Sequence, residues 1–341
     1  MAAAYKNFPF EVREIDSAHV VELKDYFEGP FGTCEVRCGH DGYSFIREYE
    51  KIATDIYHME VRPEDTFVLT FPKSGTTWTQ ELVWLIANDF DYQKALEIPL
   101  VVRFPFLESA MFLNSDVMAL LSQDSKLQEA AMIIPTVEDI TLMPSPRFMK
   151  SHIPMSLLPP KLLETCKVVY VARDPRDVAV SFYHHDKLLK SNKDNSDFKT
   201  YWNFFTRNLL IYTPHFSHIK KAWDVRDHPN MLFLFYEELS KDLAACARRV
   251  AKFLGKRVTD EEINKLCDHL NIKNFKKNKS VNLEDMKELG FLNKKESFIR
   301  KGKVGGWRDY FDEEMTIEAE RWIKENLQGT DFRFPQTDFL T

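Results

Sequence analysis

A short polar segment carries the first residues whose types and spacing could do chemistry. Residues 70–78 read TFPKSGTTW, between the apolar run 67–71 and a helical pattern. Gly75 allows a sharp turn, and both the free amides of a helix start and the charge of Lys73 attract an anion. Neighbouring hydroxyls add hydrogen-bond donors, from Ser74, Thr76 and Thr77. The segment predicts a phosphate-binding loop, with a capped helix start and a surface lysine as the alternative.

The order of these residues separates the loop from that of the nucleotide kinases. The kinase motif is G-x-x-x-x-G-K-[ST], in which the lysine follows the second glycine. Here Lys73 precedes the single glycine, Gly75. A kinase that uses ATP and Mg²⁺ is therefore disfavoured.

A second group of residues could hold another phosphate. Arg173 follows the apolar run 167–172, and Ser181 comes about two helical turns later, behind an expected N-cap at Asp174. An arginine fork and a hydroxyl can both reach one phosphate across such a helix start. A structural ion pair of Arg173 with Asp174 or Asp177 is an equal alternative.

Two further segments offer cations and a base. Residues 300–302 are Arg-Lys-Gly, and two adjacent cations beside a glycine turn suit a dianion. His152 follows the expected strand 147–150, and histidine is the side chain best suited to take a proton near neutral pH. A lone histidine is nevertheless more often structural than catalytic. His184 and His185 point in different directions on a helix, so they do not predict a metal site.

The elements that must position these residues alternate between strands and helices. Three apolar runs and a fourth strand-like segment lack the clean polar alternation of a half-exposed strand: 67–71, 167–172 and 231–236, with 147–150 as the fourth. Such runs are typical of strands buried on both faces, and so of an α/β fold with a central parallel sheet flanked by helices. Ligands of this class bind beyond the carboxyl ends of the strands, which the candidate residues follow. We expect one domain over 1–341, with a core at about 60–330.

Residues 103–146 interrupt this pattern and are expected to form an insertion or lid. The stretch 109–127 is apolar with helical spacing but weak capping signals, and 135–146 is punctuated by prolines. A wall of an apolar substrate pocket and a lid without a specific role explain the insertion equally well.

Composition argues against several classes of function. The 341 residues carry a formal charge of −6, without the basic surplus of a nucleic-acid binder. The N-terminus lacks a signal segment and no apolar run reaches membrane-spanning length, so we expect a cytoplasmic protein without a membrane association. The five cysteines do not suggest a disulfide scaffold, and Cys34, Cys38 and His40 lack the second ligand pair of a structural zinc site. No metal is expected.

The candidate segments, in their order between Phe67 and Trp307, resemble those of the cytosolic sulfotransferase family. That resemblance implies a fold like that of P-loop kinases, the donor 3′-phosphoadenosine 5′-phosphosulfate (PAPS) and the product adenosine 3′,5′-bisphosphate (PAP). It implies that Lys73 contacts the oxygen at which the leaving group forms and that Trp78 stacks on the adenine. The loop 73–77 would hold the 5′-phosphosulfate. The 3′-phosphate and adenine would be held by Arg173, Ser181, Tyr236, Arg300, Lys301 and Gly302.

The same resemblance implies the residues of the reaction itself. The family's K-T-H-x-P segment has its counterpart in KSHIP at 150–154, which makes His152 the expected general base and Lys150 an electrostatic helper. Lys73 and Ser181 complete the expected catalytic set.

Two other positions bear on the acceptor and on assembly. His185 lies where the family places an aromatic residue of the acceptor pocket, so it is expected to line that pocket. A homodimer is possible, but the family's usual C-terminal dimer motif is not present, since the aligned places hold Arg308, Asp312, Glu313 and Ile317.

We therefore expect a sulfotransferase that moves a sulfuryl group from PAPS to the hydroxyl of a small hydrophobic alcohol or phenol. The insertion and the sequence style resemble insect members of the family, among them a retinol dehydratase, in which sulfation with the same donor is followed by elimination. The intact loop TFPKSGTTW favours plain transfer over that alternative. A nucleotide- or lipid-binding protein without catalysis is a weaker alternative.

Overall fold

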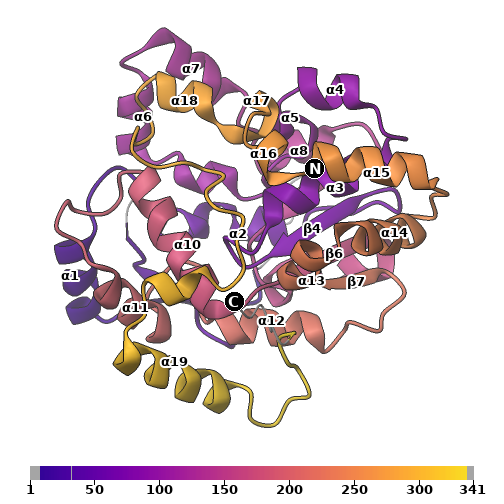
Figure 1. Ribbon diagram of the computed structural model, residues 1–341. Coiled ribbons are helices and arrows are strands. Elements are labelled where there is room, and N and C mark those ends of the chain that lie inside the picture. The colour runs from indigo at the N-terminus through magenta and orange to yellow at the C-terminus, as the bar shows by residue number, and fades with distance from the viewer. Residues whose placement is uncertain (1–7, 32, 336–341) are drawn as a thin grey trace.

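The computed structural model describes residues 8–31 and 33–335, and four parallel strands form its centre (Figure 1). Their order across the sheet is β5-β4-β6-β7. The strands are β5 (Phe148–Ser151), β4 (Thr66–Thr70), β6 (Lys167–Ala172) and β7 (Met231–Phe235). Because all four run in the same direction, their carboxyl ends meet at one edge of the sheet. The predicted fold class is confirmed, and each predicted strand matches an observed one to within one residue at either end.

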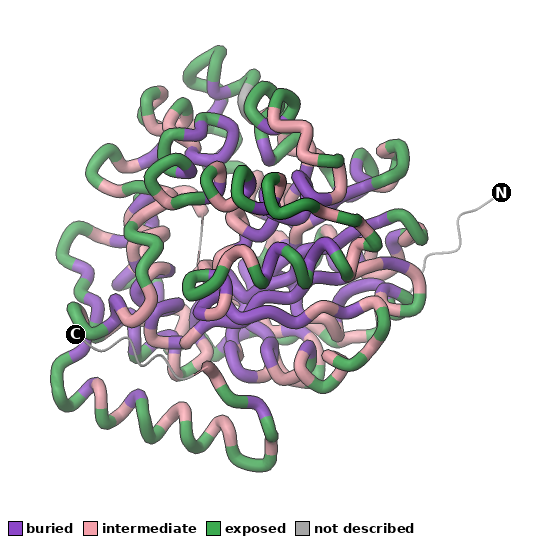
Figure 2. The backbone as a smooth tube through the Cα atoms, turned by 45° about the vertical axis from the view of Figure 1, so that its right-hand side comes forward, coloured by how far each residue is buried: buried purple, intermediate pink, exposed green. Residues whose placement is uncertain are grey.

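Both faces of this sheet are buried, as the missing polar alternation predicted. Along β4, Phe67 and Leu69 pack into one hydrophobic core and Val68 packs into another. The tube in Figure 2 accordingly runs through the strands as buried chain. The first core includes helices α10 (Pro175–Leu188), α11 (Phe198–Thr206) and α12 (His215–Trp223). The second includes α3 (Thr76–Ala87), α14 (Leu243–Leu254) and α15 (Asp260–His269).

Helix α3 is more deeply enclosed than the sequence predicted. Its expected single apolar face contains Trp78 and Leu82, but every residue from Thr79 to Ile86 is buried. The helix lies between the sheet and α14. The face of α3 that points away from the sheet is therefore covered by α14.

An antiparallel sheet that the sequence did not predict lies beside the first core. It joins β1 (Val12–Glu14), β2 (Val36–Cys38) and β3 (Tyr43–Phe45) in that order. Helices α1 (Ser17–Tyr26) and α2 (Tyr49–Tyr57) flank it along the chain. The side chains of β2 and β3 are largely buried in the first core, so this sheet covers one edge of that core.

The predicted insertion is made of short helices. They are η1 (Ser109–Phe112), α6 (Ser115–Leu121), α7 (Ser125–Met132) and α8 (Val137–Leu142), and α5 (Leu100–Arg103) leads into them. The expectation of weak caps is wrong, because α6, α7 and α8 begin at the side-chain caps Asn114, Asp124 and Thr136. Each of these caps begins a new helix of about two turns, so the stretch does not form one long helix.

A separate small cluster holds the outer part of the insertion. Val117, Leu121 and Leu127 pack together, and Phe291 is among the residues that cover them. Figure 1 shows α6 and α7 beside α18 (Glu284–Glu288), far along the sequence. The insertion is thus attached to the segment that leads to residues 300–302.

The remaining elements cover the edges of the domain, and α19 lies outermost with much of its surface exposed (Figure 2). No helix within the described ranges is long and apolar enough to cross a membrane. The remaining elements are α4 (Tyr92–Glu97), η2 (Met155–Leu157), α9 (Leu162–Thr165), α13 (Tyr236–Lys241), α16 (Ile272–Phe275), α17 (Lys279–Asn282), η3 (Gly306–Asp309) and α19 (Glu313–Asn326).

Candidate functional site

The predicted phosphate loop forms a tight turn between β4 and α3. Lys73 and Gly75 have left-handed backbone conformations, with φ of 66° and 98°. A Cβ atom at Gly75 would lie 2.6 Å from a ring carbon of Tyr236, so only glycine fits this approach. The Ser74 hydroxyl is buried without a hydrogen-bond partner among the described residues. Its hydrogen-bonding capacity is therefore available to a ligand in the loop.

Arg173 reaches across from the end of β6 to the phosphate loop. Its Nη1 donates a hydrogen bond of 2.9 Å to the main-chain carbonyl of Lys73, and its Nη2 donates one of 3.3 Å to that of Lys303. The guanidinium lies 4.1 Å above the ring of Tyr236, and its Nε has no partner in the described chain. The alternative ion pair is loose, since 4.0 Å separates Nη2 from Oδ2 of Asp177.

Asp177 mainly binds main-chain N–H groups and is not primarily the ion-pair partner of Arg173. Its carboxylate accepts hydrogen bonds from the main-chain N–H groups of Gly305, at 2.7 Å, and Trp307, at 2.9 Å. Burial raises the pKa of this carboxyl group, while Arg173 and the two N–H donors oppose that shift. Asp174 is the N-cap of α10, as predicted, and it also pairs with Arg176. Asp177 therefore fastens the 300–307 segment to α10.

Residues 300–302 lie beside the phosphate loop but do not act as one unit. Gly302 has a φ of 61°, and a Cβ there would lie 2.7 Å from Ile272. Lys301 is exposed and donates a hydrogen bond of 3.1 Å to Asp309. Arg300 is half-buried, and its charge contributes to lowering the pKa of Lys73.

Positive charges converge on Lys73. Burial lowers the pKa of its ammonium group to about 7, and the charges of Lys150 and Arg173 add to that shift more strongly than Asp186 opposes it. The ammonium group lies 4.8 Å from the ring centroid of Phe298. Cations held together with little compensating negative charge create a potential that attracts an anion.

Trp78 and Tyr236 form an aromatic corner next to these cations. Their ring centroids are 5.8 Å apart with an interplanar angle of 58°, and the Trp78 indole donates a hydrogen bond of 3.0 Å to the carbonyl of Leu270. Ser181 lies in α10, half-buried, and its hydroxyl has no hydrogen-bond partner in the part of the chain described. The structure thus brings Trp78, Tyr236 and Arg173 together beside the phosphate loop.

His152 follows β5 at the same edge of the sheet. Its Nδ1 lies 2.9 Å from the main-chain carbonyl of Thr70. A carbonyl only accepts, so this hydrogen bond places the proton on Nδ1 and leaves Nε2 as the proton acceptor. The carbonyl of His152 itself accepts from Nε2 of His218 at 2.9 Å, and Nδ1 of His218 accepts from the hydroxyl of Tyr170. Burial, followed by the charge of Lys150, holds the pKa of His152 well below its usual value.

Lys150 belongs to β5 itself, one side-chain repeat before His152. Burial lowers the pKa of its ammonium group to about 8, and the carboxylate of Glu108 opposes that shift. The ammonium group lies 4.1 Å from the ring centroid of Phe106. The ammonium group of Lys150 therefore loses its proton at a pH only slightly above neutral.

Sequence reasoning missed two residues that touch the predicted base. Glu108 is fully buried, and its Oε1 accepts the main-chain N–H of His152 at 2.6 Å. Tyr212 is also buried, and its ring centroid is 5.6 Å from that of His152. A single acidic residue in the apolar run PFLESAMF was the available signal for Glu108, since an isolated charge in such a run needs a partner.

The two adjacent histidines of α10 differ as their positions on a helix predict. His185 is half-buried, with its ring centroid 5.9 Å from that of Phe298 and its Nδ1 without a partner among the described residues. His184 is fixed between Glu296, at 3.0 Å, and the hydroxyl of Tyr310, at 2.6 Å. His184 therefore has a structural task, and His185 remains next to the aromatic residues near Lys73.

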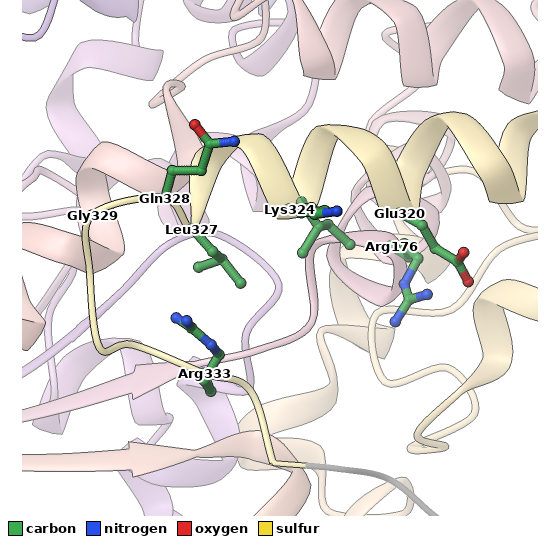
Figure 3. Close-up of a pocket in the computed structure, with 8 residues that line it drawn as sticks. Arg176, Glu320, Lys324, Leu327, Gln328, Gly329 and Arg333 are labelled. Atoms are coloured by element: carbon green, nitrogen blue, oxygen red, sulfur yellow. The ribbon is translucent and has the colours of Figure 1, made fainter.

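A pocket between helices and loops lies elsewhere on the molecule. Figure 3 shows it between α19 and the segment after it, with a volume of about 650 Å³. None of the predicted site residues lines it, because its walls come from Arg176, Glu320, Ile323, Lys324, Leu327, Gln328, Gly329 and Arg333. Its mixed lining lacks the convergent buried groups found around Lys73, so the candidate site is the one at the edge of the sheet.

Comparison with known proteins agrees with this arrangement. A family model described as "Sulfotransferase domain" matches residues 63–331. The luciferin sulfotransferase of Photinus pyralis is 32% identical over 94% of this chain and 87% of its own length. Retinol dehydratase in a complex with retinol and PAP superposes with a TM-score of 0.91, at 45% identity over 96% of this chain and 99% of that one. The same enzyme with androsterone and the inactive cofactor PAP gives a TM-score of 0.91 at 44% identity.

The match covers the loop, the strand ends and the 300–307 segment together, so it extends over every part of the candidate site. This chain therefore belongs to the sulfotransferase family and is a transferase of sulfur-containing groups.

Proposed function

We propose that this enzyme transfers a sulfuryl group from PAPS to the hydroxyl of a small hydrophobic alcohol or phenol and releases PAP. The observation that carries the proposal is the convergence at one sheet edge of an anion-receptive loop and a base. Lys73 and Arg173 supply positive charge at the phosphate loop. His152 presents an unprotonated Nε2 at the carboxyl end of β4, from which that loop begins.

The donor site has groups that suit a doubly phosphorylated nucleotide. The buried hydroxyl of Ser74 and the Nε of Arg173 are both without partners in the described chain, which is costly unless a ligand uses them. Trp78 and Tyr236 provide an aromatic surface for the adenine ring of the nucleotide. The relatives of known structure hold PAP, which supports PAPS as the donor for this chain.

The reaction follows from these positions. Nε2 of His152 takes the proton of the acceptor hydroxyl as that oxygen forms a bond to sulfur. The bond between sulfur and the phosphate oxygen breaks, and Lys73 stabilises the negative charge that develops on that oxygen. Loop amides hold the phosphate in place. Removal of one such electrostatic donor typically costs about 3 kcal/mol of transition-state stabilisation.

The acceptor side of the site is apolar and aromatic. Phe106 lies 5.3 Å from His152, Phe112 lies 6.1 Å from Phe106, and His185 lies near Phe298, measured between ring centroids. Phe106 and Phe112 come from the insertion, which favours its role as a pocket wall. The related retinol dehydratase accommodates retinol and androsterone, so flat hydrophobic alcohols are the first acceptors to try.

Elimination after transfer is the second candidate, and the 45% identity to retinol dehydratase favours testing it. The two outcomes differ in the product. A sulfate ester indicates transfer alone, whereas an anhydro product with free sulfate indicates elimination. The cytoplasm as compartment, and a homodimer without the usual motif, remain predictions.

The donor assignment can be tested first by calorimetric titration with PAP and, separately, with ATP and Mg²⁺. Tight binding of PAP that ATP does not match supports the proposal. A transfer assay with labelled PAPS and a panel of phenols, steroid alcohols and retinol then identifies the acceptor class. Preference for ATP, or PAP binding without transfer to any of these acceptors, contradicts it.

A further inference from the structure

A buried carboxylate that the proposed mechanism does not use lies directly behind the base. The segment before η1 runs beside β5 as an additional short partner, with Lys150 N donating to Pro105 O and Leu107 N donating to Lys150 O, both at 2.9 Å. This pairing carries Glu108 to the end of β5. There its Oε1 accepts the main-chain N–H of His152 at 2.6 Å.

The other carboxylate oxygen of Glu108 is unsatisfied. Oε2 is buried and has no hydrogen-bond partner among the described residues, and the same is true of the hydroxyls of Tyr49 and Tyr212. All three side chains are fully buried, and the charge of Glu108 raises the pKa of both tyrosines further than burial alone does. A buried charge without full hydrogen bonding is costly, so its retention beside a reacting group calls for a reason.

Backbone strain is found at the same place. Tyr212 has a φ of 69°, an uncommon conformation for a bulky residue, while its ring packs edge-on against His152. Strained residues persist where the surrounding structure determines them fully, and they gather at functional sites. Glu108 and Tyr212 thus both contact His152, one by a hydrogen bond to its main chain and the other by its ring.

We propose that Glu108 is a positioning residue for sulfuryl transfer, which holds the main chain of His152 and supplies a negative charge beside Lys150. The inference rests on the proposed function, because it needs His152 as the base. Glu108 touches neither donor nor acceptor in this scheme. It acts through His152 by a hydrogen bond and through Lys150 by its charge.

The charges around Glu108 set the pH range in which the second effect operates. The groups that face it are Lys150, Ser151 and His152 from the end of β5, with Tyr49 from α2 and Tyr212. Burial raises the pKa of Glu108 to about 7, against the hydrogen bond from the main-chain N–H of His152. Glu108 is therefore neutral at about pH 6 and charged at about pH 8, where the pKa of Lys150, also about 8, makes a counter-charge matter most.

Glu108→Gln separates the two effects. The amide oxygen of glutamine still accepts the N–H of His152, but the negative charge is gone. We expect kcat close to that of the wild type at about pH 6 and several-fold lower at about pH 8, so that the alkaline limb of the kcat profile moves to lower pH. An equal effect at both pH values, or none, overturns the role of the charge.

Glu108→Ala removes the hydrogen bond as well. We expect kcat to fall on the order of 100-fold at every pH, because a small displacement of a reacting group has an effect of that size. The Kd for PAP should remain within roughly threefold of the wild-type value, since Glu108 is not part of the donor site. Glu138→Gln is the matched control, with the same chemical change in the same insertion at an exposed position, and it should match the wild type.

Melting temperature and PAP titration establish that each variant is folded, and if Glu108→Ala is not, Glu108→Gln decides alone. His152→Ala distinguishes this inference from the proposed function. An inactive His152→Ala beside an unaffected Glu108→Gln and Glu108→Ala overturns the positioning role only. An active His152→Ala overturns the base assignment and, with it, the positioning role.

Discussion

The guanidinium of Arg173 is hydrogen-bonded to the main-chain carbonyl of Lys73 at 2.9 Å, which ties the end of β6 to the phosphate loop. These residues are 100 positions apart in the sequence. The bond keeps a buried cation in place next to the ring of Tyr236, so the donor site is organised by the protein's own contacts. A site that is organised in advance loses less entropy when the ligand binds.

Replacement of Arg173 by alanine should therefore weaken PAP binding strongly. Loss of a buried charged hydrogen-bond partner costs about 2–5 kcal/mol, which raises the Kd at least roughly 30-fold. Calorimetric titration measures the change. Arg226→Ala is the control, since Arg226 lies over Trp223 at 4.2 Å, far from the loop, and should bind PAP normally. An unchanged Kd for Arg173→Ala would show that Arg173 does not hold the donor.

Gly75→Ala should disrupt the loop for two physical reasons that a control can separate. Alanine at a φ of 98° is strained, and its Cβ would lie 2.6 Å from the ring of Tyr236. Gly255 also has a positive φ, of 72°, but open space around its Cβ position. Gly255→Ala should lower stability by about 1–2 kcal/mol and leave the PAP affinity unchanged.

Gly75→Ala should lose stability by more than this and weaken PAP binding at least roughly tenfold, by thermal unfolding and titration. If the two variants behave alike, the approach of Tyr236 to the loop has no importance for donor binding.

Replacement of His152 by alanine should remove general-base catalysis while it leaves donor binding intact. Proton transfer by a positioned side chain contributes about 10²–10⁴-fold, so kcat should fall by that factor. The Kd for PAP should change little, because the ring is hydrogen-bonded to Thr70 at the end of β4 and not to residues 73–77 of the loop. His228→Ala, at a half-buried position outside the site, serves as the control in the same transfer assay. Near-normal kcat in His152→Ala would refute the base assignment.

Binding of PAP should take up protons at mildly alkaline pH. Burial and neighbouring cations lower the pKa of Lys73 to about 7, so this group is largely neutral at about pH 8 in the free enzyme. A bound polyanion favours the charged form and raises the pKa, so protons are taken up on binding and the affinity falls as pH rises through 7 to 8. Calorimetry at about pH 8 in two buffers of different ionisation enthalpy gives the number of protons.

Lys73→Met should reduce that proton uptake and make the affinity less dependent on pH. Lys150, with a pKa of about 8, contributes a smaller share that remains in this variant. Proton release on PAP binding to the wild type would contradict this account.

Features of the site that depend on one strand or one helix start could be predicted from the sequence. The strands were found to within one residue at their ends because continuous apolar runs are local signals. Asp174 was predicted as a cap from its place before Pro175, and the structure confirms it. Gly75 was predicted to allow a sharp turn, and its φ of 98° is a conformation that favours glycine.

Features that depend on contacts between distant segments could not be predicted in this way. Glu108 reaches His152 only because the segment before η1 pairs with β5, and periodicity says nothing about such pairing. The task of Asp177 depends on Gly305 and Trp307, more than 100 positions away. The strands β1, β2 and β3 have three residues each, too few for alternation to show.

The small cluster under the insertion has a consequence for how this protein can change. Val117, Leu121 and Leu127 share no member with the two large cores that hold the sheet. Substitutions without shared partners have nearly additive effects, so residues 113–132 can vary without a cost to the strands that carry Lys73 and His152. Evolution or an engineer can therefore vary this outer module while the packing around the donor site stays as it is.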